Sequence, residues 1–370
     1  MKKILVLSLC LMMVVSIFAG CGQSNVIETT AETTTEETTT EETTTEETTT
    51  EETTTEDPTP EGNVDYLTGL YDLPDEAVGT RPVAIMVNNV PDAMPQYGIS
   101  EADIIVEMPV EGNQTRFLAI YPSCVTMPYI VSIRSYRYYF PPIALGFDAI
   151  YVHWGEDTSM LDYYYSLGMS SYDGISSYPF FSRDQGRLNQ GYALEHTSAF
   201  DGTAFYQYIS QNGERISLDE DYANEAFYFV GSYDEPEDPN GDDCIYAQVN
   251  FGAMYSTFDY SSEDHKYYKT NCGNAQVDGI TGEQLSFTNV IMLETSVWTR
   301  DDGYHKGVDW YGGEDSVGYY ISNGKIQKIH WAKENEYARL KLYDENWQEL
   351  YINRGKTYIA FCPYDSVYAE

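Results

Sequence analysis

The stretch VEMPVEGNQTRFLAIY, residues 106–121, places three charged side chains, Glu107, Glu111 and Arg116, among apolar neighbours. The branched and aromatic residues around them favour two β-strands joined by a tight connection. A charge beside a sheet core must be paired or take part in chemistry, because moving an unpaired charge out of water is costly. The two glutamates are therefore candidate catalytic acids, and Arg116 is a candidate ligand-binding residue.

Paired glutamates raise the hypothesis of a glycoside hydrolase. On a straight strand, Glu107 and Glu111 stand about 13 Å apart at Cα. Retaining enzymes need about 5 Å between the carboxyl groups, and inverting enzymes need at most about 9.5 Å. Pro109, between the two, predicts a sheet edge or a bulge that would re-aim one of them. A single general acid at the turn, Glu111 beside Gly112, would also suffice.

Arginine is the only basic residue type between Lys3 and Lys266. Its planar fork of donors suits bidentate binding of carboxylates and phosphates. Arg134 and Arg137 would share one face of a helix after a strand-like run, where free backbone N–H groups favour anions. A structural network of arginines and nearby acids is the alternative, and the sequence leaves both open.

Two histidines lie where site residues are often found. His153 ends the run DAIYVHW, at the position where strands of α/β sheets deliver site residues, and His196 lies in LEHTSAF, which we interpret as a loop before a helix. Each is a candidate ligand-binding residue or a satisfied structural side chain.

The first 20 residues predict a lipoprotein signal peptide. Two lysines precede an apolar run, and the small residues of FAGC precede Cys21. We expect the Cys21 thiol to carry lipid, such as palmitate, which would tether the protein to the outer face of the cell membrane. An ordinary signal peptide with an incidental cysteine is the alternative. A permanent transmembrane helix is disfavoured because the run is short.

Residues 21–63 predict a disordered stalk rich in threonine and glutamate. The part from 27 to 63 holds 13 acids and no bases, with almost no apolar side chains, so it cannot offset the entropy of ordering. The whole chain has a formal net charge of −39. This charge disfavours nucleic acid as a partner and restricts any anionic ligand to a local basic site.

Four cysteines follow Cys21 in the chain, namely Cys124, Cys244, Cys272 and Cys362. In an oxidising compartment they allow three disulfide pairings, and buried thiols are the alternative. No CxxC spacing occurs, so no zinc site and no redox motif is expected. We expect no metal and no cofactor.

The body is long enough for two domains. Segment 64–215 alternates strand-like runs with helical candidates in SYRYYFPPIALG, TSMLDYYYSLGM and GTAFYQYISQNG, which predicts an α/β N-terminal domain. Segment 216–244 is acidic and broken by proline and glycine, as in a linker. Segment 245–365 contains short β-type runs separated by DG, SNG and DEN turns, which predicts a β-rich, antiparallel C-terminal domain.

The ordered series RPVAIMVNN, ADIIVEMPVEGNQTRFLAIY, IRSYR, FDAIYVHWG, FFSRDQGR and EHT resembles the YerB-like bacterial lipoproteins, built on a domain of unknown function (DUF3048). VDGITGEQLSFTNVIML and GYYISNGKIQKIHWAKEN resemble its C-terminal part. The resemblance covers nearly all of 64–365 and implies an α/β domain followed by a separate C-terminal domain. The resemblance to this family implies no established activity for the chain.

The positions that match the polar motifs of this family are Glu107, Glu111, Thr115, Arg116, Arg134, Ser135, Arg137, His153, Arg183, Asp184 and His196. The chain departs from the family at Met94, where an arginine is more usual, and at Glu195 and Thr197, which flank His196 in place of proline and asparagine. We expect Ser135, Arg183 and Asp184 to bind ligand together with the arginines and histidines above.

Three functional hypotheses follow. The first is a membrane-anchored lipoprotein whose Arg/Glu/His pocket binds an anionic or cell-wall glycan ligand. The second is an envelope enzyme that cleaves peptidoglycan glycan strands with Glu111 or Glu107 as general acid. The third is a structural envelope scaffold.

Overall fold

The computed structural model describes residues 60–233 and 235–370, which belong to one compact unit, Glu56–Glu370. The predicted signal peptide, Cys21 and nearly all of the predicted stalk lie outside the described residues. Within the described ranges, no helix is long and apolar enough to cross a membrane.

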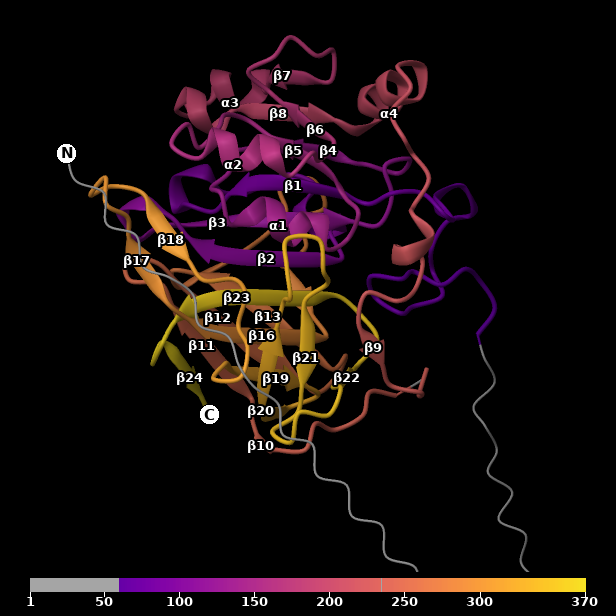
Figure 1. The fold of residues 1–370 in the computed structure, drawn as a ribbon, viewed down its shortest axis with the longest axis vertical. Helices are drawn as coiled ribbons and strands as arrows, with labels where there is room; N and C mark the ends of the chain where they lie inside the picture. The colour runs from indigo at the N-terminus through magenta and orange to yellow at the C-terminus, as the bar shows by residue number, and fades with distance from the viewer. Residues whose placement is uncertain (1–59, 234) are drawn as a thin grey trace, which may run out of the picture. The chain divides into compact units, whose positions relative to one another are not determined.

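An eleven-stranded mixed sheet runs through the unit (Figure 1). In spatial order its strands are β10 (Asp242–Asp243), β20 (Lys325–Ala332), β19 (Val317–Ser322), β16 (Asn289–Thr295), β23 (Thr357–Pro363), β2 (Ile104–Pro109), β3 (Thr115–Tyr121), β1 (Val83–Asn88), β5 (Ile150–His153) and β6 (Ser171–Asp173), with β21 (Lys341–Tyr343) beside β20.

β23 connects the two halves of this sheet. It pairs in parallel with β16 on one side and with β2 on the other. Strands from segment 64–215 and from segment 245–365 therefore lie in one continuous sheet. The predicted domain limits separate segments of the sequence, but strands from both segments belong to the same sheet.

Smaller sheets complete the fold. A six-stranded antiparallel sheet contains β11 (Tyr246–Asn250), β12 (Tyr255–Ser261), β13 (Lys266–Asn271), β14 (Asn274–Ala275), β15 (Ser286–Phe287) and β24 (Val367–Ala369). A three-stranded antiparallel sheet contains β4 (Tyr129–Val131), β7 (Phe181–Arg183) and β8 (Ser198–Asp201). Two strand pairs remain, β17 (Val297–Thr299) with β18 (Lys306–Val308) and β9 (Tyr228–Phe229) with β22 (Tyr351–Ile352).

Helices are few and short. They are α1 (Phe140–Leu145), α2 (Leu161–Ser166), α3 (Gln185–Asn189) and α4 (Gly202–Gln211). α1, α2 and α4 fall in the three segments with helical candidates. The N-terminal prediction is confirmed only as a mixed, strand-rich fold, because β2, β3 and β1 are antiparallel neighbours and only β5 and β6 continue in parallel. The C-terminal segment is β-rich, as predicted, but it is not wholly antiparallel, because β16 and β23 pair in parallel.

The main sheet has an apolar core on each face. Neighbouring residues of a strand point to opposite faces. Val106 and Leu118 lie in one core, together with residues of α1, whereas Ile105 and Phe117 lie in the other. This alternation decides where each charge of the β2–β3 hairpin is placed.

All four cysteines in the described part of the chain are free thiols, and Cys124, Cys244 and Cys362 are buried. The sequence left both disulfides and buried thiols open, and the structure contains thiols at these four positions. Burial raises the pKa of Cys124 and of Cys244 to about 11, so these thiols are poor nucleophiles at neutral pH.

Candidate functional site

The hairpin predicted over residues 106–121 is present. β2 ends at Pro109, a 3-10 turn spans Glu111–Asn113, and β3 begins at Thr115. The predicted sheet edge is wrong, because β2 lies between β3 and β23, and Pro109 is its last residue. Glu107 pairs with Phe117, and Met108 pairs with Arg116, so Glu107 and Arg116 project to opposite faces of the sheet.

Glu107 is fully buried, and both its oxygens are satisfied. Oε1 accepts hydrogen bonds from Asn89 Nδ2 at 2.9 Å and Thr115 Oγ1 at 2.6 Å. Oε2 accepts from Ser256 Oγ at 2.9 Å and the Tyr358 hydroxyl at 2.6 Å. Four donors around an inaccessible carboxylate indicate a structural role, and the candidate catalytic role of Glu107 is not supported.

The counter-charge of Glu107 is Lys269, which is also fully buried. Its Nζ lies 3.6 Å from Glu107 Oε2 and donates to Ser256 Oγ and to Gln276 Oε1, each at 2.7 Å. Gln276 in turn donates to Asn89 Oδ1 at 2.9 Å. We call this set, Asn89, Glu107, Thr115, Ser256, Lys269, Gln276 and Tyr358, the buried network.

Glu111 is held by Arg137 on the other face. Arg137 Nε lies 2.8 Å from Oε1, and Nη2 lies 2.6 Å from Oε2. Burial raises the pKa of Glu111, but the hydrogen bonds and charge of Arg137 outweigh burial and hold it below its usual value. A general acid needs a raised pKa, so this environment does not favour Glu111 in that role.

Arg116 has no carboxylate partner. Its Nη1 donates to the Ser135 carbonyl at 2.6 Å and to Ser135 Oγ at 3.1 Å. No carboxylate oxygen in the described part of the chain lies within 4.0 Å of its guanidinium nitrogens. Burial, followed by the charges of Arg137 and Arg134, lowers the pKa of Arg116. Arg116 and Arg137 share Ser135 Oγ as an acceptor, and Arg116 is repelled by both Arg137 and Arg134. We call Arg116, Arg134 and Arg137 the arginine cluster.

Arg134 is the accessible member of the arginine cluster, with a side chain 28% exposed. Its Nη1 lies 3.5 Å from Glu195 Oε2, and its Nε is buried without a hydrogen-bond partner in the part of the chain that the structure describes. The predicted helix over Arg134 and Arg137 is wrong. The segment runs beside β1 instead, and the Arg134 amide donates to the Met86 carbonyl at 3.0 Å.

His196 borders the arginine cluster through Glu195 and Asn88. Its Nδ1 lies 3.0 Å from Asn88 Nδ2, and its Nε2 lies 3.7 Å from Glu195 Oε1. Burial lowers the pKa of His196. His196 ends a 3-10 turn, and β8 follows it before α4, so the predicted loop leads into a strand rather than directly into a helix.

His153 ends β5, as predicted, but it is buried among tyrosines. Its Nδ1 lies 3.0 Å from the Gly155 carbonyl and its Nε2 lies 3.1 Å from the Tyr164 hydroxyl, while the Tyr136 ring packs on it at 4.9 Å. Burial lowers the pKa of His153 to about 4. The imidazole is therefore a neutral, satisfied core side chain.

Arg183 and Asp184 make structural contacts that do not involve the arginine cluster. Arg183 donates to the Leu194 carbonyl at 2.7 Å, and its guanidinium lies 4.2 Å from the centre of the Trp154 ring. Asp184 caps α3 by accepting from the Arg187 amide at 2.7 Å. The structure thus brings Glu111, Arg116, Arg134, Ser135, Arg137 and His196 together, and it places Glu107, His153, Arg183 and Asp184 in separate structural contacts.

Sequence reasoning missed Lys269 and Asn88, and it named Glu195 only as a departure from the family beside His196. A signal for Lys269 was present, since it shares the alternation of the strand KYYKTN with Tyr267 and Asn271, which are buried. Asn88 carried no such signal, because its role depends on a contact with the distant His196.

The fold and the site define a mixed, strand-rich protein in which an arginine cluster borders a sheet shared by both halves of the chain. The chain belongs to the family described as Protein of unknown function (DUF3048), whose N-terminal domain matches residues 67–215 and whose C-terminal domain matches residues 247–359. The resemblance found in the sequence is confirmed.

Similar proteins come from Bacillus subtilis. A protein of strain 168 with the name "Putative lipoprotein YerB" is 28% identical over 310 residues, which cover 80% of this chain and 85% of that protein. A crystal structure of the YerB protein from Bacillus subtilis has a TM-score of 0.68 and 24% identity, and covers 83% of this chain and 99% of that one. The crystal structure shows that the fold is shared.

Proposed function

We propose that this protein is an extracytoplasmic lipoprotein, tethered to the outer face of the cell membrane through lipid on Cys21, whose arginine cluster binds an anionic group of a cell-envelope ligand. The leader sequence before Cys21 and the name of the Bacillus relative support the tether. The stalk would act as the spacer between the membrane and the folded unit.

One observation carries the binding proposal, namely that Arg116 is charged, mostly buried and without an acid partner in the described chain. Glu111 is occupied by Arg137, and Glu195 lies at 3.5 Å from Arg134 with a side chain 54% exposed. An incoming carboxylate or phosphate would relieve the repulsion among three guanidinium groups and could accept hydrogen bonds from their unused N–H donors.

The geometry favours binding over glycan cleavage. Glu107 is inaccessible, and the low pKa of Glu111 does not suit a general acid. The scaffold hypothesis has no specific contact in its favour, and it predicts that the arginine cluster can be changed without loss of any ligand.

The binding test uses the full chain, purified in detergent, with purified cell wall before and after removal of its anionic polymers. We expect retention on the untreated wall and at least about tenfold weaker retention of Arg134→Lys, because lysine keeps the charge but removes the fork. Arg215→Lys is the matched control, since Arg215 is exposed and pairs with Asp148 away from the cluster. Equal retention of wild type and Arg134→Lys would contradict the proposal.

The same incubation separates binding from cleavage. Binding alone leaves the number of reducing ends of the glycan unchanged, whereas an enzyme would create new ones. New ends that disappear with Glu111→Gln would replace the binding proposal by the enzyme hypothesis.

The tether has its own test. Cys21→Ala should release the protein into the medium or block its maturation, because the thiol is the attachment point for lipid. Radiolabelled palmitate should enter the wild type and not the variant. Equal labelling of both would show that Cys21 is not the lipidated residue.

A further inference from the structure

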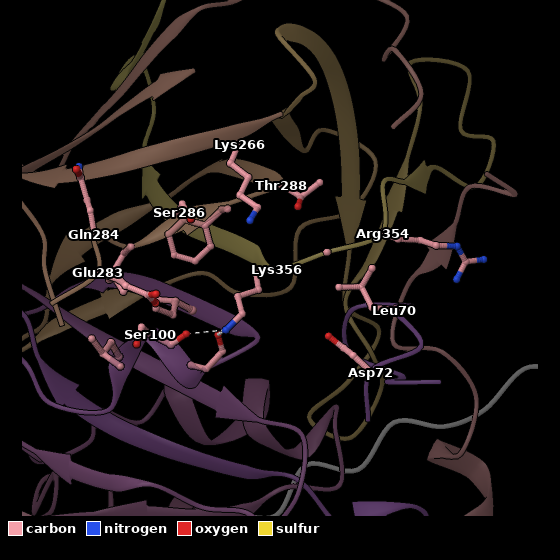
Figure 2. A pocket seen from close by; sticks show the side chains of 16 residues that line it. Leu70, Asp72, Ser100, Lys266, Glu283, Gln284, Ser286, Thr288, Arg354 and Lys356 are labelled. Carbon is pink, nitrogen blue, oxygen red and sulfur yellow. Dashed lines mark hydrogen bonds between the residues drawn. The ribbon is translucent and has the colours of Figure 1, made fainter. Parts of the chain in front are cut away.

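A pocket lies where the two family segments meet, and none of the residues of the arginine cluster lines it (Figure 2). Its volume is about 450 Å³, within the range of small-molecule sites. Ile99 and Ser100 come from the N-terminal segment, and Lys266, Glu283 and Phe287 come from the C-terminal segment. We call it the seam pocket.

The seam pocket has an apolar wall of buried side chains, among them Ile99, Ile105, Leu285 and Phe287. Phe287 belongs to β15, which pairs with β13 at Tyr267, directly after Lys266. The wall is therefore held by the sheet and is formed without any ligand. An apolar group that entered the pocket would leave water without requiring the wall to rearrange.

Charges of both signs line the same space without pairing. The side chains of Lys266, Glu283 and Asp72 make no hydrogen bond and no ion pair with any residue in the ranges 60–233 and 235–370. Figure 2 shows Lys266 extending into the space from one wall and Lys356 lying opposite, beside Ser100. These unused groups can accept partners of opposite charge from a ligand.

The other two cations of the seam pocket are already engaged. Lys356 Nζ donates to the Ser100 carbonyl at 2.6 Å and to the Ala102 carbonyl at 3.1 Å. Arg354 Nη1 donates to the Gly69 carbonyl at 2.6 Å, and Figure 2 shows its guanidinium directed away from Lys266. Lys266 is thus the cation available to a ligand, with Glu283 and Asp72 as available anions.

We propose that the seam pocket binds a zwitterion with an apolar side chain, namely a free amino acid or a short peptide with both termini free. Lys266 receives the carboxylate, Glu283 receives the ammonium group, and the apolar wall receives the side chain. A purely anionic ligand would be repelled by Glu283 and Asp72, and a purely cationic ligand would be repelled by Lys266, so neither would match the charges of the seam pocket.

The test titrates the full chain in detergent with leucyl-leucine, N-acetyl-leucyl-leucine and leucyl-leucinamide by isothermal titration calorimetry. The second peptide lacks the ammonium group and the third lacks the carboxylate, while the apolar side chains are the same. We expect leucyl-leucine to bind roughly tenfold more tightly than either blocked peptide, as befits loss of one charge-assisted hydrogen bond. Equal affinities for the three peptides, or no binding of leucyl-leucine, would overturn the proposal.

Variants assign the two ends of the ligand. Lys266→Gln should weaken the binding of leucyl-leucine roughly tenfold and leave the affinity for leucyl-leucinamide unchanged. Glu283→Gln should remove the preference for a free ammonium group. Both side chains are exposed and make no hydrogen bond or ion pair in the described chain, so thermal unfolding should be unaltered. Lys325→Gln is the control, because Lys325 pairs with exposed Asp243 and does not line the pocket. If Lys266→Gln binds leucyl-leucine as the wild type does, the assignment is wrong.

Discussion

The charged side chains on the two faces of the β2–β3 hairpin differ in how completely they are paired. On one face the buried network surrounds Glu107 and Lys269, and each carboxylate oxygen of Glu107 accepts hydrogen bonds from two donors. On the other face the arginine cluster holds three guanidinium groups; within the described residues, Glu111 binds Arg137, the more exposed Glu195 lies 3.5 Å from Arg134, and Arg116 has no acid partner. Complete pairing stabilises a fold, whereas an excess of one charge leaves capacity for a ligand.

This difference explains why burial alone does not identify a functional charge. Glu107 and Arg116 are both buried, and both interrupt apolar strands. Only the partners distinguish them, since Glu107 has Lys269 while Arg116 has Ser135 and two like charges nearby. Substitutions on each face should therefore have different consequences for stability and for binding.

The largest effect on stability should come from the buried network. Lys269→Met leaves Glu107 buried without its counter-charge, and we expect a loss of about 3–5 kcal/mol in the free energy of unfolding. Denaturant titration of the full chain measures it. The double variant Lys269→Met/Glu107→Gln should recover part of the loss, and a single variant as stable as the wild type would show that the pair is not needed.

A smaller loss is expected for the ion pair on the other face. Glu111→Gln should cost about 2 kcal/mol at pH 7, because the charge-assisted hydrogen bonds to Arg137 are weakened. The folded pKa of Glu111 is depressed, so its contribution is complete above the unfolded pKa of about 4.3 and is lost as the pH falls through the folded pKa. Wild type and variant should thus differ less at pH 3 than at pH 7. A constant difference across this range would contradict the ionic role of Glu111.

Arg116→Met should change the free energy of unfolding by less than about 1 kcal/mol. It removes the hydrogen bonds to Ser135, but it also removes repulsion from Arg134 and Arg137 and the cost of burying a charge. Retention on anionic cell wall should nevertheless fall at least about tenfold. A destabilisation as large as that of Lys269→Met would make the two faces equivalent and would classify the arginine cluster as structural.

The smallest effect is expected from the predicted stalk. Deleting residues 27–60 removes almost no apolar side chains, so the thermal unfolding of the remaining chain should be unchanged. Comparison of unfolding midpoints with and without the stalk tests this. A clear loss of stability would mean that the stalk contacts the folded unit.

Much of the local structure could be predicted from the sequence. The β2–β3 hairpin, the strand that ends at His153 and the three helical segments each follow from short-range patterns of apolar, branched and turn residues. The family resemblance also rested on ordered local motifs and is confirmed. Local patterns fail for Arg134 and Arg137, because the pairing of this segment with β1 overrides the spacing that suggested a helix.

Tertiary structure alone decided which charges meet. Glu107 and Lys269 lie 162 positions apart in sequence and are joined because β13 packs over the face to which Glu107 points. The shared sheet likewise depends on β23, which inserts between β16 and β2 from the end of the chain. The sequence determined that charged residues lie within strands. Long-range strand pairing determined which face of the sheet each charge points to and which partner it meets. The alternation of side chains along a strand defines two faces, but it does not define which segment packs on each face.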